Sequence, residues 1–185
     1  ASLVSAALGP MAHLVTNNYT EAGLRQAMSN QSRAMLLDEM EHDSGARIRS
    51  VIKMIRQMSS GEGAVIKRGS PGGASQSFFL NGAVMMFCIS PTHMEPQDRA
   101  RVTRLKLLPL DTNSTQSLSI EDCIEFAENL SLYLWRRAIN RFEHFKKAFY
   151  VFKESLRTLG LTNRAGDQIA TILAGADILL FDHTP

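Results

Sequence analysis

The sequence of 185 residues lacks several of the signals that place a chain at once in a known class of protein. Its two cysteines, Cys88 and Cys123, are 35 residues apart and form no C-x-x-C motif, so we expect a reduced, cytoplasmic protein. No apolar run reaches the roughly 18 residues that a membrane span requires, so we expect no membrane partner. Residues 1–10 carry no basic segment ahead of their apolar residues and make a poor signal peptide.

The histidines and serines lack the surroundings typical of a zinc centre or a hydrolase. None of the five histidines pairs with another histidine or a cysteine at metal-ligand spacing. His42 lies near Asp38, Glu39 and Asp43, and we assign no metal site to that group. No serine has a G-x-S-x-G setting, so hydrolase chemistry has no support.

The charge is small overall but unevenly distributed. The formal net charge is +2, yet residues 45–70, 97–110 and 136–157 carry +5, +3 and +5. Basic segments on a nearly neutral chain can follow a phosphate backbone. Solvated helix faces give the same pattern, so charge alone assigns no partner.

The first 110 residues alternate predicted strands and helices. Continuous apolar runs at residues 34–37 and 84–89 predict strands buried on both faces. Residues 12–16 and 105–110 predict two further strands. Helices are predicted over residues 2–8, 20–29 and 48–58, and Thr20 is the expected N-cap of the second. This alternation predicts an α/β protein with a parallel sheet.

A hairpin and a helical region complete the expected architecture. Residues 64–68 and 75–80 flank a Gly/Pro-rich loop, which predicts a β-hairpin. The chain becomes helical after a polar linker, with Ser119 and Asp122 as a capping pair. We therefore expect an α/β core over residues 1–117 and a helical region over residues 118–185.

The segment A-M-L-L-D-E has the form of a Walker B strand, because it is a buried strand that ends in two acids. Ligands of a parallel sheet bind where the strands end, so Asp38 can hold the water shell of a Mg²⁺ ion there. Glu39 can then orient or deprotonate an attacking water. Many strands without a catalytic role also end in acidic residues, so the segment alone is a weak indication of a Walker B motif.

Two later segments carry side chains that complement this acid pair. The strand at residues 84–89 is followed by Ser90, whose hydroxyl can touch a phosphate or the water. A basic cluster, D-R-A-R-V-T-R, comes next, and an arginine in it can stabilise transition-state charge on a phosphate of a neighbouring subunit.

In this order the motifs resemble those of the AAA+ and superfamily 3 helicase group of P-loop ATPases. The resemblance is closer to the ATPase domain of phage- and prophage-encoded primase-helicase proteins, and it spans residues 1–110. Its segments are T-E-A-G-L-R-Q, M-L-L-D-E-M-E, R-G-S-P-G-G, M-F-C-I-S-P and D-R-A-R-V-T-R-L. Residues 163–176 are similar to the region that follows the ATPase core in those proteins.

The resemblance implies a role for each matching residue of the acid and basic segments. Asp38 would be the Mg²⁺-side Walker B acid and Glu39 the catalytic base. Ser90 would be the sensor-1 group. Arg101, or else Arg99 or Arg104, would be an arginine finger that acts across a subunit interface of a ring-shaped homo-oligomer.

The resemblance also implies a partner. Lys67 and Arg68 would lie on the pre-sensor-1 hairpin, which grips single-stranded DNA in the pore of such helicases. Contact with the backbone of a single strand by basic groups is salt-dependent. The implied function is ATP hydrolysis coupled to movement on single-stranded DNA.

One required motif is missing, because the chain contains no G-x-x-x-x-G-K-[ST]. Without that Walker A loop the phosphates of ATP lose their backbone cradle and their lysine. We therefore expect an incomplete P-loop core whose loop lies upstream of Ala1, and ATP and Mg²⁺ binding only when that loop is present. The alternative is a non-catalytic oligomerisation or partner-docking module. A third, weaker option is a nucleic-acid-binding regulator that uses the basic helices at residues 136–157.

Overall fold

The computed structural model describes residues 1–16, 19–39, 45–59, 64–69, 75–89, 94–99, 101–107, 119–161 and 163–182. The chain divides into two compact units, Ala1–Met94 and Glu95–Pro185. The division lies earlier in the chain than the domain boundary expected at residue 117, and the two domains remain a prediction.

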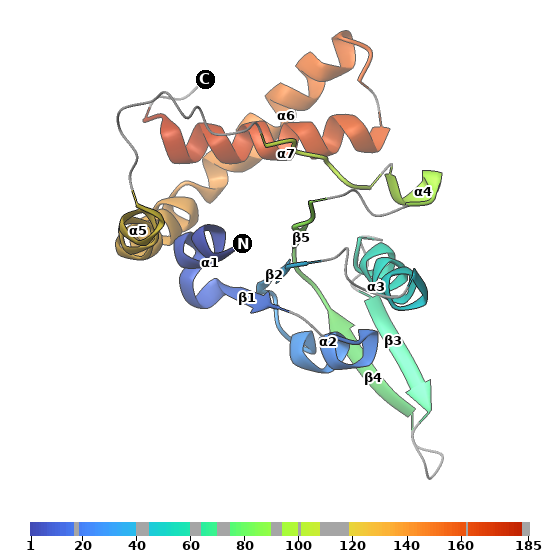
Figure 1. The fold of residues 1–185 in the computed structure, drawn as a ribbon. Coiled ribbons are helices and arrows are strands. Elements are labelled where there is room, and N and C mark those ends of the chain that lie inside the picture. Colours follow the sequence, from blue (N-terminus) through green and yellow to red (C-terminus); the bar gives the residue numbers. More distant parts are fainter. Residues whose placement is uncertain are drawn as a thin grey trace. The chain divides into compact units, whose positions relative to one another are not determined.

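A three-stranded parallel sheet forms the centre of the first unit (Figure 1). Strand β2 (Ala34–Leu37) lies between β1 (Ala12–Val15) and β5 (Val84–Met86). Leu36 is level with Leu14 on one side and with Met85 on the other. The unit is therefore α/β, as the alternation of strands and helices predicted.

Three α-helices of this unit are described, and a side-chain cap fixes the start of one of them. Helix α1 (Ser2–Leu8) continues into a short 3₁₀ turn (Gly9–Met11), and α2 (Glu21–Met28) lies between β1 and β2 in sequence. The hydroxyl of Thr20 accepts a hydrogen bond from the backbone N–H of Gly23 at 3.1 Å, which confirms the expected N-cap. Helix α3 (Gly45–Met58) follows β2.

One hydrophobic core joins the sheet to α2 and α3. Met35 and Leu37 point to the same face because side chains alternate along a strand, and both are fully buried. They pack with residues of the two helices and of the hairpin, chiefly Leu24, Met28, Val51, Met54 and Leu80. Leu36 points to the opposite face and is also fully buried. The central strand is therefore covered on both faces, as its continuous apolar run predicted.

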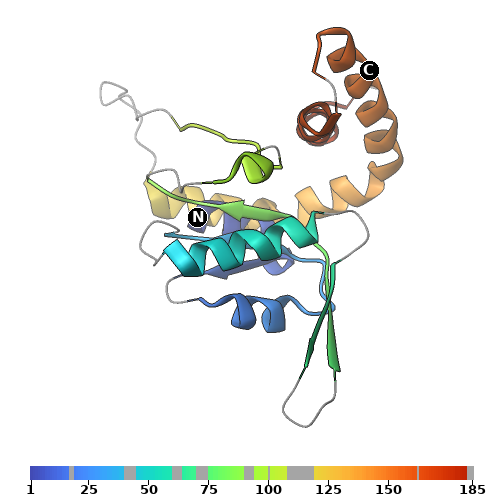
Figure 2. The ribbon, with the colours of Figure 1, turned by 90° about the vertical axis from the view of Figure 1, so that its right-hand side faces the viewer.

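The expected hairpin consists of β3 (Ala64–Gly69) and β4 (Ser75–Leu80), which pair antiparallel. Leu80 belongs to the core and so fixes the inner end of the hairpin. Figure 2 shows the two strands extending away from the three-stranded sheet. In the register, Lys67 pairs with Ser77 and Arg68 with Gln76, near the outer end.

The second unit is helical. It contains α4 (Pro96–Arg99), α5 (Ile120–Asn140), α6 (Phe142–Thr158) and α7 (Asn163–Leu180). The hydroxyl of Ser119 accepts from the N–H of Asp122 at 3.0 Å and caps α5, as expected. Helices α6 and α7 pack side by side, and the small buried side chains of Ala148, Ala170 and Ala174 allow a close approach.

Two strand predictions differ from the structure. Strand β5 ends at Met86, three residues before the expected end, because Met86 pairs with Leu37, the last residue of β2. The described part of the strand expected at residues 105–110 has no regular structure. Leu105 and Leu107 are 70% and 88% exposed, so no sheet covers them. Among the described residues no helix is long and apolar enough to cross a bilayer.

Candidate functional site

The predicted acid pair lies at the carboxyl end of the sheet. Asp38 and Glu39 follow β2 directly, and the N–H of Asp38 donates to the carbonyl of Val15 at 3.0 Å. On the other side, the N–H of Phe87 donates to the carbonyl of Leu37 at 2.8 Å. These bonds tie the ends of all three strands together, with the acids at the middle strand. Parallel sheets bind their ligands at this edge.

Glu39 has an unusual backbone conformation. Its φ is 54°, in the left-handed region, and its N–H donates to the Oδ1 of Asp38 at 3.1 Å. A residue with a Cβ held in this region costs on the order of 1–3 kcal/mol, and such residues cluster at functional sites. The turn leaves Asp38 half-buried and Glu39 exposed. The two carboxylates therefore have different surroundings.

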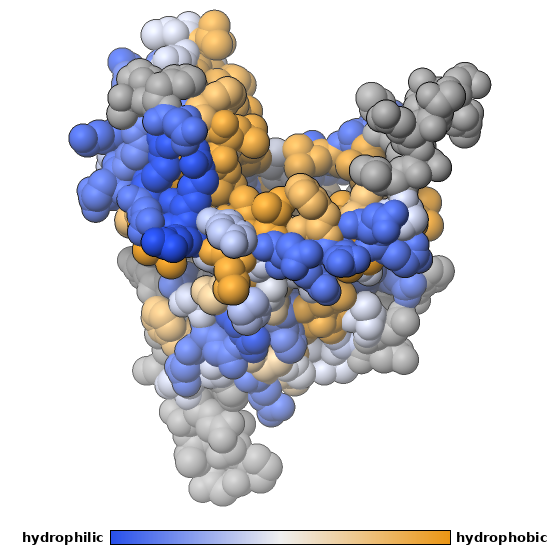
Figure 3. Space-filling model, turned by 90° about the vertical axis from the view of Figure 1, so that its left-hand side faces the viewer, coloured by the Kyte–Doolittle hydropathy of each residue, from blue (hydrophilic) through white to orange (hydrophobic). Residues whose placement is uncertain are grey.

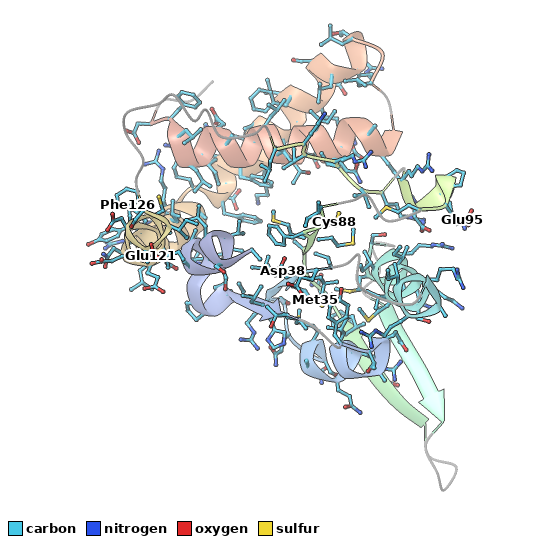
Figure 4. All side chains as sticks on the ribbon, viewed as in Figure 1. Met35, Asp38, Cys88, Glu95, Glu121 and Phe126 are labelled. Carbon is cyan, nitrogen blue, oxygen red and sulfur yellow. The ribbon has the colours of Figure 1, made fainter. Side chains whose placement is uncertain are left out.

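Strand β5, the neighbour of β2, places a cysteine at the same edge of the sheet. Cys88 is two residues beyond β5 and exposed, and Figure 4 labels it together with Asp38. The sequence alone does not single out Cys88 as a site residue, because the strand register decides which residues meet at the same edge of the sheet. Ser90, the predicted sensor residue, lies outside the described residues.

The candidate arginines belong to the second unit, whereas the acids belong to the first. Arg99 is the last residue of α4, and the N–H of Arg101 donates to the carbonyl of Asp98 at 2.9 Å. The Nε of Arg101 is buried and has no hydrogen-bond partner within the described stretches, whereas Arg104 is exposed. The role of an arginine finger stays a prediction for all three.

Most basic residues of α5 and α6 bind groups of their own unit. Arg137 donates from Nε to the carbonyl of Ile178 and from Nη2 to that of Phe181, both at 2.7 Å. Arg141 donates to the same Phe181 carbonyl at 2.6 Å. These two arginines therefore hold the last turn of α7 and are less suited to a phosphate backbone.

Three lysine and arginine side chains of α6 form ion pairs: Lys146 with Glu143 at 2.6 Å, Lys153 with Asp167 at 2.7 Å and Arg157 with Glu154 at 3.0 Å. The hydrogen bond from Lys153 to Asp167 raises the pKa of the lysine above its ordinary value of 10.5. These pairings reduce the support for a regulator that binds nucleic acid through residues 136–157.

One buried polar pair in this unit has no signal in the sequence. His144 Nε2 lies 2.7 Å from Asp177 Oδ2, and the two side chains are only 12% and 9% exposed. The residues are far apart in sequence, on α6 and α7, so no spacing could have paired them. The contact joins the same two helices as the alanines do.

The carboxylates at the sheet edge are ligands for hard divalent cations such as Mg²⁺. Carboxylate oxygens are the ligands that Mg²⁺ prefers, and Mg²⁺ usually keeps several waters. Within the described part of the chain no three His, Cys, Asp or Glu side chains form a closed metal cluster. The carboxylate of Asp38 thus fits a hydrated Mg²⁺ ion, whereas the chain has no Walker A loop for the phosphates of ATP.

No family model, curated protein or solved structure shows a significant match to this chain. The local geometry at the end of β2 and the order of the motifs are therefore the observations that bear on function.

Proposed function

We propose that this chain is the ATPase portion of a phage-type DNA replication protein, a helicase that moves on single-stranded DNA. The observation that carries the proposal is the position of Asp38 and Glu39. They lie at the carboxyl end of the middle strand of a parallel sheet, with Glu39 in a left-handed turn. An acid pair there can act on a bound nucleotide.

The two acids take different parts in the proposed reaction. Asp38, half-buried and close to the strand end, would hold the water shell of Mg²⁺, which neutralises charge on the phosphates when bound. Glu39, exposed, would accept the proton of the attacking water. Ser90 would contact the γ-phosphate, and Arg101, or else Arg99 or Arg104, would act on the site of a neighbouring subunit.

An unpaired edge of the sheet supports the proposal. In the described residues, the outer edge of β5 pairs with no strand. Its free N–H and C=O groups can accept a further parallel strand. A strand added there would end at the same edge as Asp38. A phosphate-binding loop that follows such a strand would therefore face the acids.

Replacing one oxygen tests the proposal. In the full-length protein, Glu39→Gln should lower the kcat for ATP hydrolysis by at least about a hundredfold. Nucleotide affinity should be unchanged, because the amide keeps the shape of the side chain. Glu121→Gln, which alters an exposed acid on α5, is the control and should keep normal turnover. Normal hydrolysis by Glu39→Gln would show that Glu39 is not the base.

A second candidate function is a non-catalytic module for oligomerisation or partner docking. The missing phosphate loop favours it, and so do the exposed apolar side chains of α5. The encoded sequence upstream of Ala1 separates the two. A Gly-Lys-Ser/Thr close to Ala1 supports the ATPase, and its absence supports the module.

A further inference from the structure

The turn between the hairpin and the sheet contains Asn81-Gly82, the only Asn-Gly pair in the chain. It joins β4, which ends at Leu80, to β5, which begins at Val84. Asn81 is exposed, so its side chain is in contact with water, as are the hydrophilic side chains, in blue, on the face that Figure 3 shows. Within the described residues the amide of Asn81 has no hydrogen-bond partner, so nothing holds it in place.

An asparagine that precedes a glycine can lose its side-chain amide without an enzyme. The backbone nitrogen of the glycine attacks the Cγ of the asparagine and forms a new N–C bond. The C–N bond of the side-chain amide breaks, and the amide leaves as ammonia with the proton of the backbone N–H. Water then opens the cyclic imide at one of its two carbonyls, which gives aspartate or isoaspartate. Glycine favours the attack because it has no Cβ to hinder the nitrogen.

The backbone nitrogen of Gly82 is available for this attack. Its N–H has no hydrogen-bond acceptor in the described part of the chain. Two other exposed asparagines differ in this respect. The N–H that follows Asn30 donates to the carbonyl of Met28 at 3.2 Å, and the residue that carries it has a side chain. The N–H that follows Asn140 donates to the carbonyl of Arg137 at 3.0 Å, so it must first break a helical hydrogen bond.

We propose that Asn81 is a site of spontaneous deamidation, at which the chain forms isoaspartate as it ages. The main chain of an isoaspartate runs through the former side chain, so the backbone gains one CH₂ group. The former α-carbonyl becomes a free carboxylate, which adds a negative charge. The reaction consumes only water and does not depend on the proposed ATPase activity.

The longer backbone would fall where the chain has little room. A Cβ on Gly82 would lie 2.6 Å from the carbonyl oxygen of Arg33, so the turn passes close to the segment before β2. Before the turn, Leu80 is fully buried. After it, the carbonyl of Ala83 accepts from the N–H of Met35 at 2.8 Å. An isoaspartate in this turn must strain or break one of these contacts, so it should loosen the joint between the hairpin and β2.

Peptide mapping by mass spectrometry tests the site, after the full chain has been kept at mildly alkaline pH. Asn81 should deamidate at least about tenfold faster than Asn30 or Asn140, because their neighbouring N–H groups react only after local opening. The product should be a substrate for isoaspartate methyltransferase. Asn81→Gln should stop the reaction, since the longer side chain closes its ring far more slowly. No conversion at Asn81, or equal rates at the three asparagines, would overturn the proposal.

The same measurement in urea separates the effect of the fold from that of the sequence. The turn leaves Asn81 and its neighbouring nitrogen free, so the folded chain should deamidate there within about tenfold of the unfolded rate. Asn140 should react much faster in urea than in the folded chain, because α5 is then lost. A fold that slows Asn81 as strongly as Asn140 would show that the turn protects it and would contradict the proposal.

Urea unfolding followed by circular dichroism tests the effect on the joint. The aged chain, separated from the fresh chain by its extra charge, should unfold at a lower urea concentration. Asn81→Asp is the matched control, because it adds the charge without lengthening the backbone, and its midpoint should stay near that of the natural chain. An aged chain as stable as the fresh one, or an equal loss in Asn81→Asp, would contradict the loosened joint.

Discussion

Gly166, in the first turns of α7, has no room for a side chain. A Cβ at this position would lie 2.6 Å from the carbonyl oxygen of Leu161, a backbone atom of the turn before the helix. A Cβ at Gly175, later in the same helix, would meet nothing within 4 Å. Gly166 is therefore required by the close approach of the turn, whereas the space around Gly175 would accept a side chain.

This difference predicts opposite effects of the same change. Gly166→Ala should lower the free energy of unfolding by about 1–3 kcal/mol, because the turn must move. Gly175→Ala should raise it by up to about 1 kcal/mol, since alanine favours a helix. Urea unfolding followed by Trp135 fluorescence measures both. A stabilising Gly166→Ala would mean that the turn at Leu161 relaxes without cost.

At the scale of residues, caps were predictable and backbone strain was not. Thr20 and Ser119 cap their helices as expected, because an N-cap needs only a short polar side chain ahead of an apolar run. The left-handed φ of Glu39 has no such signal, since glutamate rarely adopts it. The contact of His144 with Asp177 depends on how two helices pack, which no local pattern reports.

At the scale of elements, the hairpin β3–β4 is a case in which the structure was predictable and the function is still to be tested. Its pairing is confirmed, whereas the contact of Lys67 and Arg68 with DNA remains a proposal. Replacing both by alanine in the full chain should weaken single-stranded DNA binding. The plot of log association constant against log salt concentration has a negative slope. Its magnitude should decrease by about 1–2, at about 0.7 for each lost phosphate contact. Fluorescence anisotropy of a labelled oligonucleotide at several salt concentrations measures it.

The control removes equal charge from another element. Arg49→Ala with Lys53→Ala takes two exposed cations from α3 and should leave the slope nearly unchanged. An equal fall in both double variants would indicate a general charge effect, and an unaltered slope in the hairpin variant would remove the hairpin from the DNA path.

Element type was predictable wherever burial decided it. Residues 34–37 lie in a sheet and residues 48–58 in a helix because their apolar residues had period and length typical of each. The strand predicted at residues 105–110 was wrong over the described residues 105–107, because a strand also needs a neighbouring strand to pair with. Leu105 and Leu107 have none in the described structure, and no single segment of sequence reports its partners.

At the scale of the whole molecule, the two compact units should unfold separately. The only tryptophan of the chain, Trp135, lies in the second unit, so its fluorescence reports that unit alone. Leu37→Ala opens a cavity in the core of the first unit and should destabilise it by about 2–5 kcal/mol. The urea transition seen by far-ultraviolet circular dichroism should then split, while the fluorescence midpoint stays unchanged. A shifted fluorescence midpoint would show that the units unfold as one.

The left-handed turn at Glu39 has a consequence for the evolution of this chain. Glycine adopts that conformation without strain, so selection for thermal stability alone would favour Glu39→Gly by about 1 kcal/mol. A glutamate at this position gives up that stability and keeps a carboxylate at the open edge of the sheet. If Glu39 has the proposed catalytic role, its backbone strain is a trade-off of stability for activity.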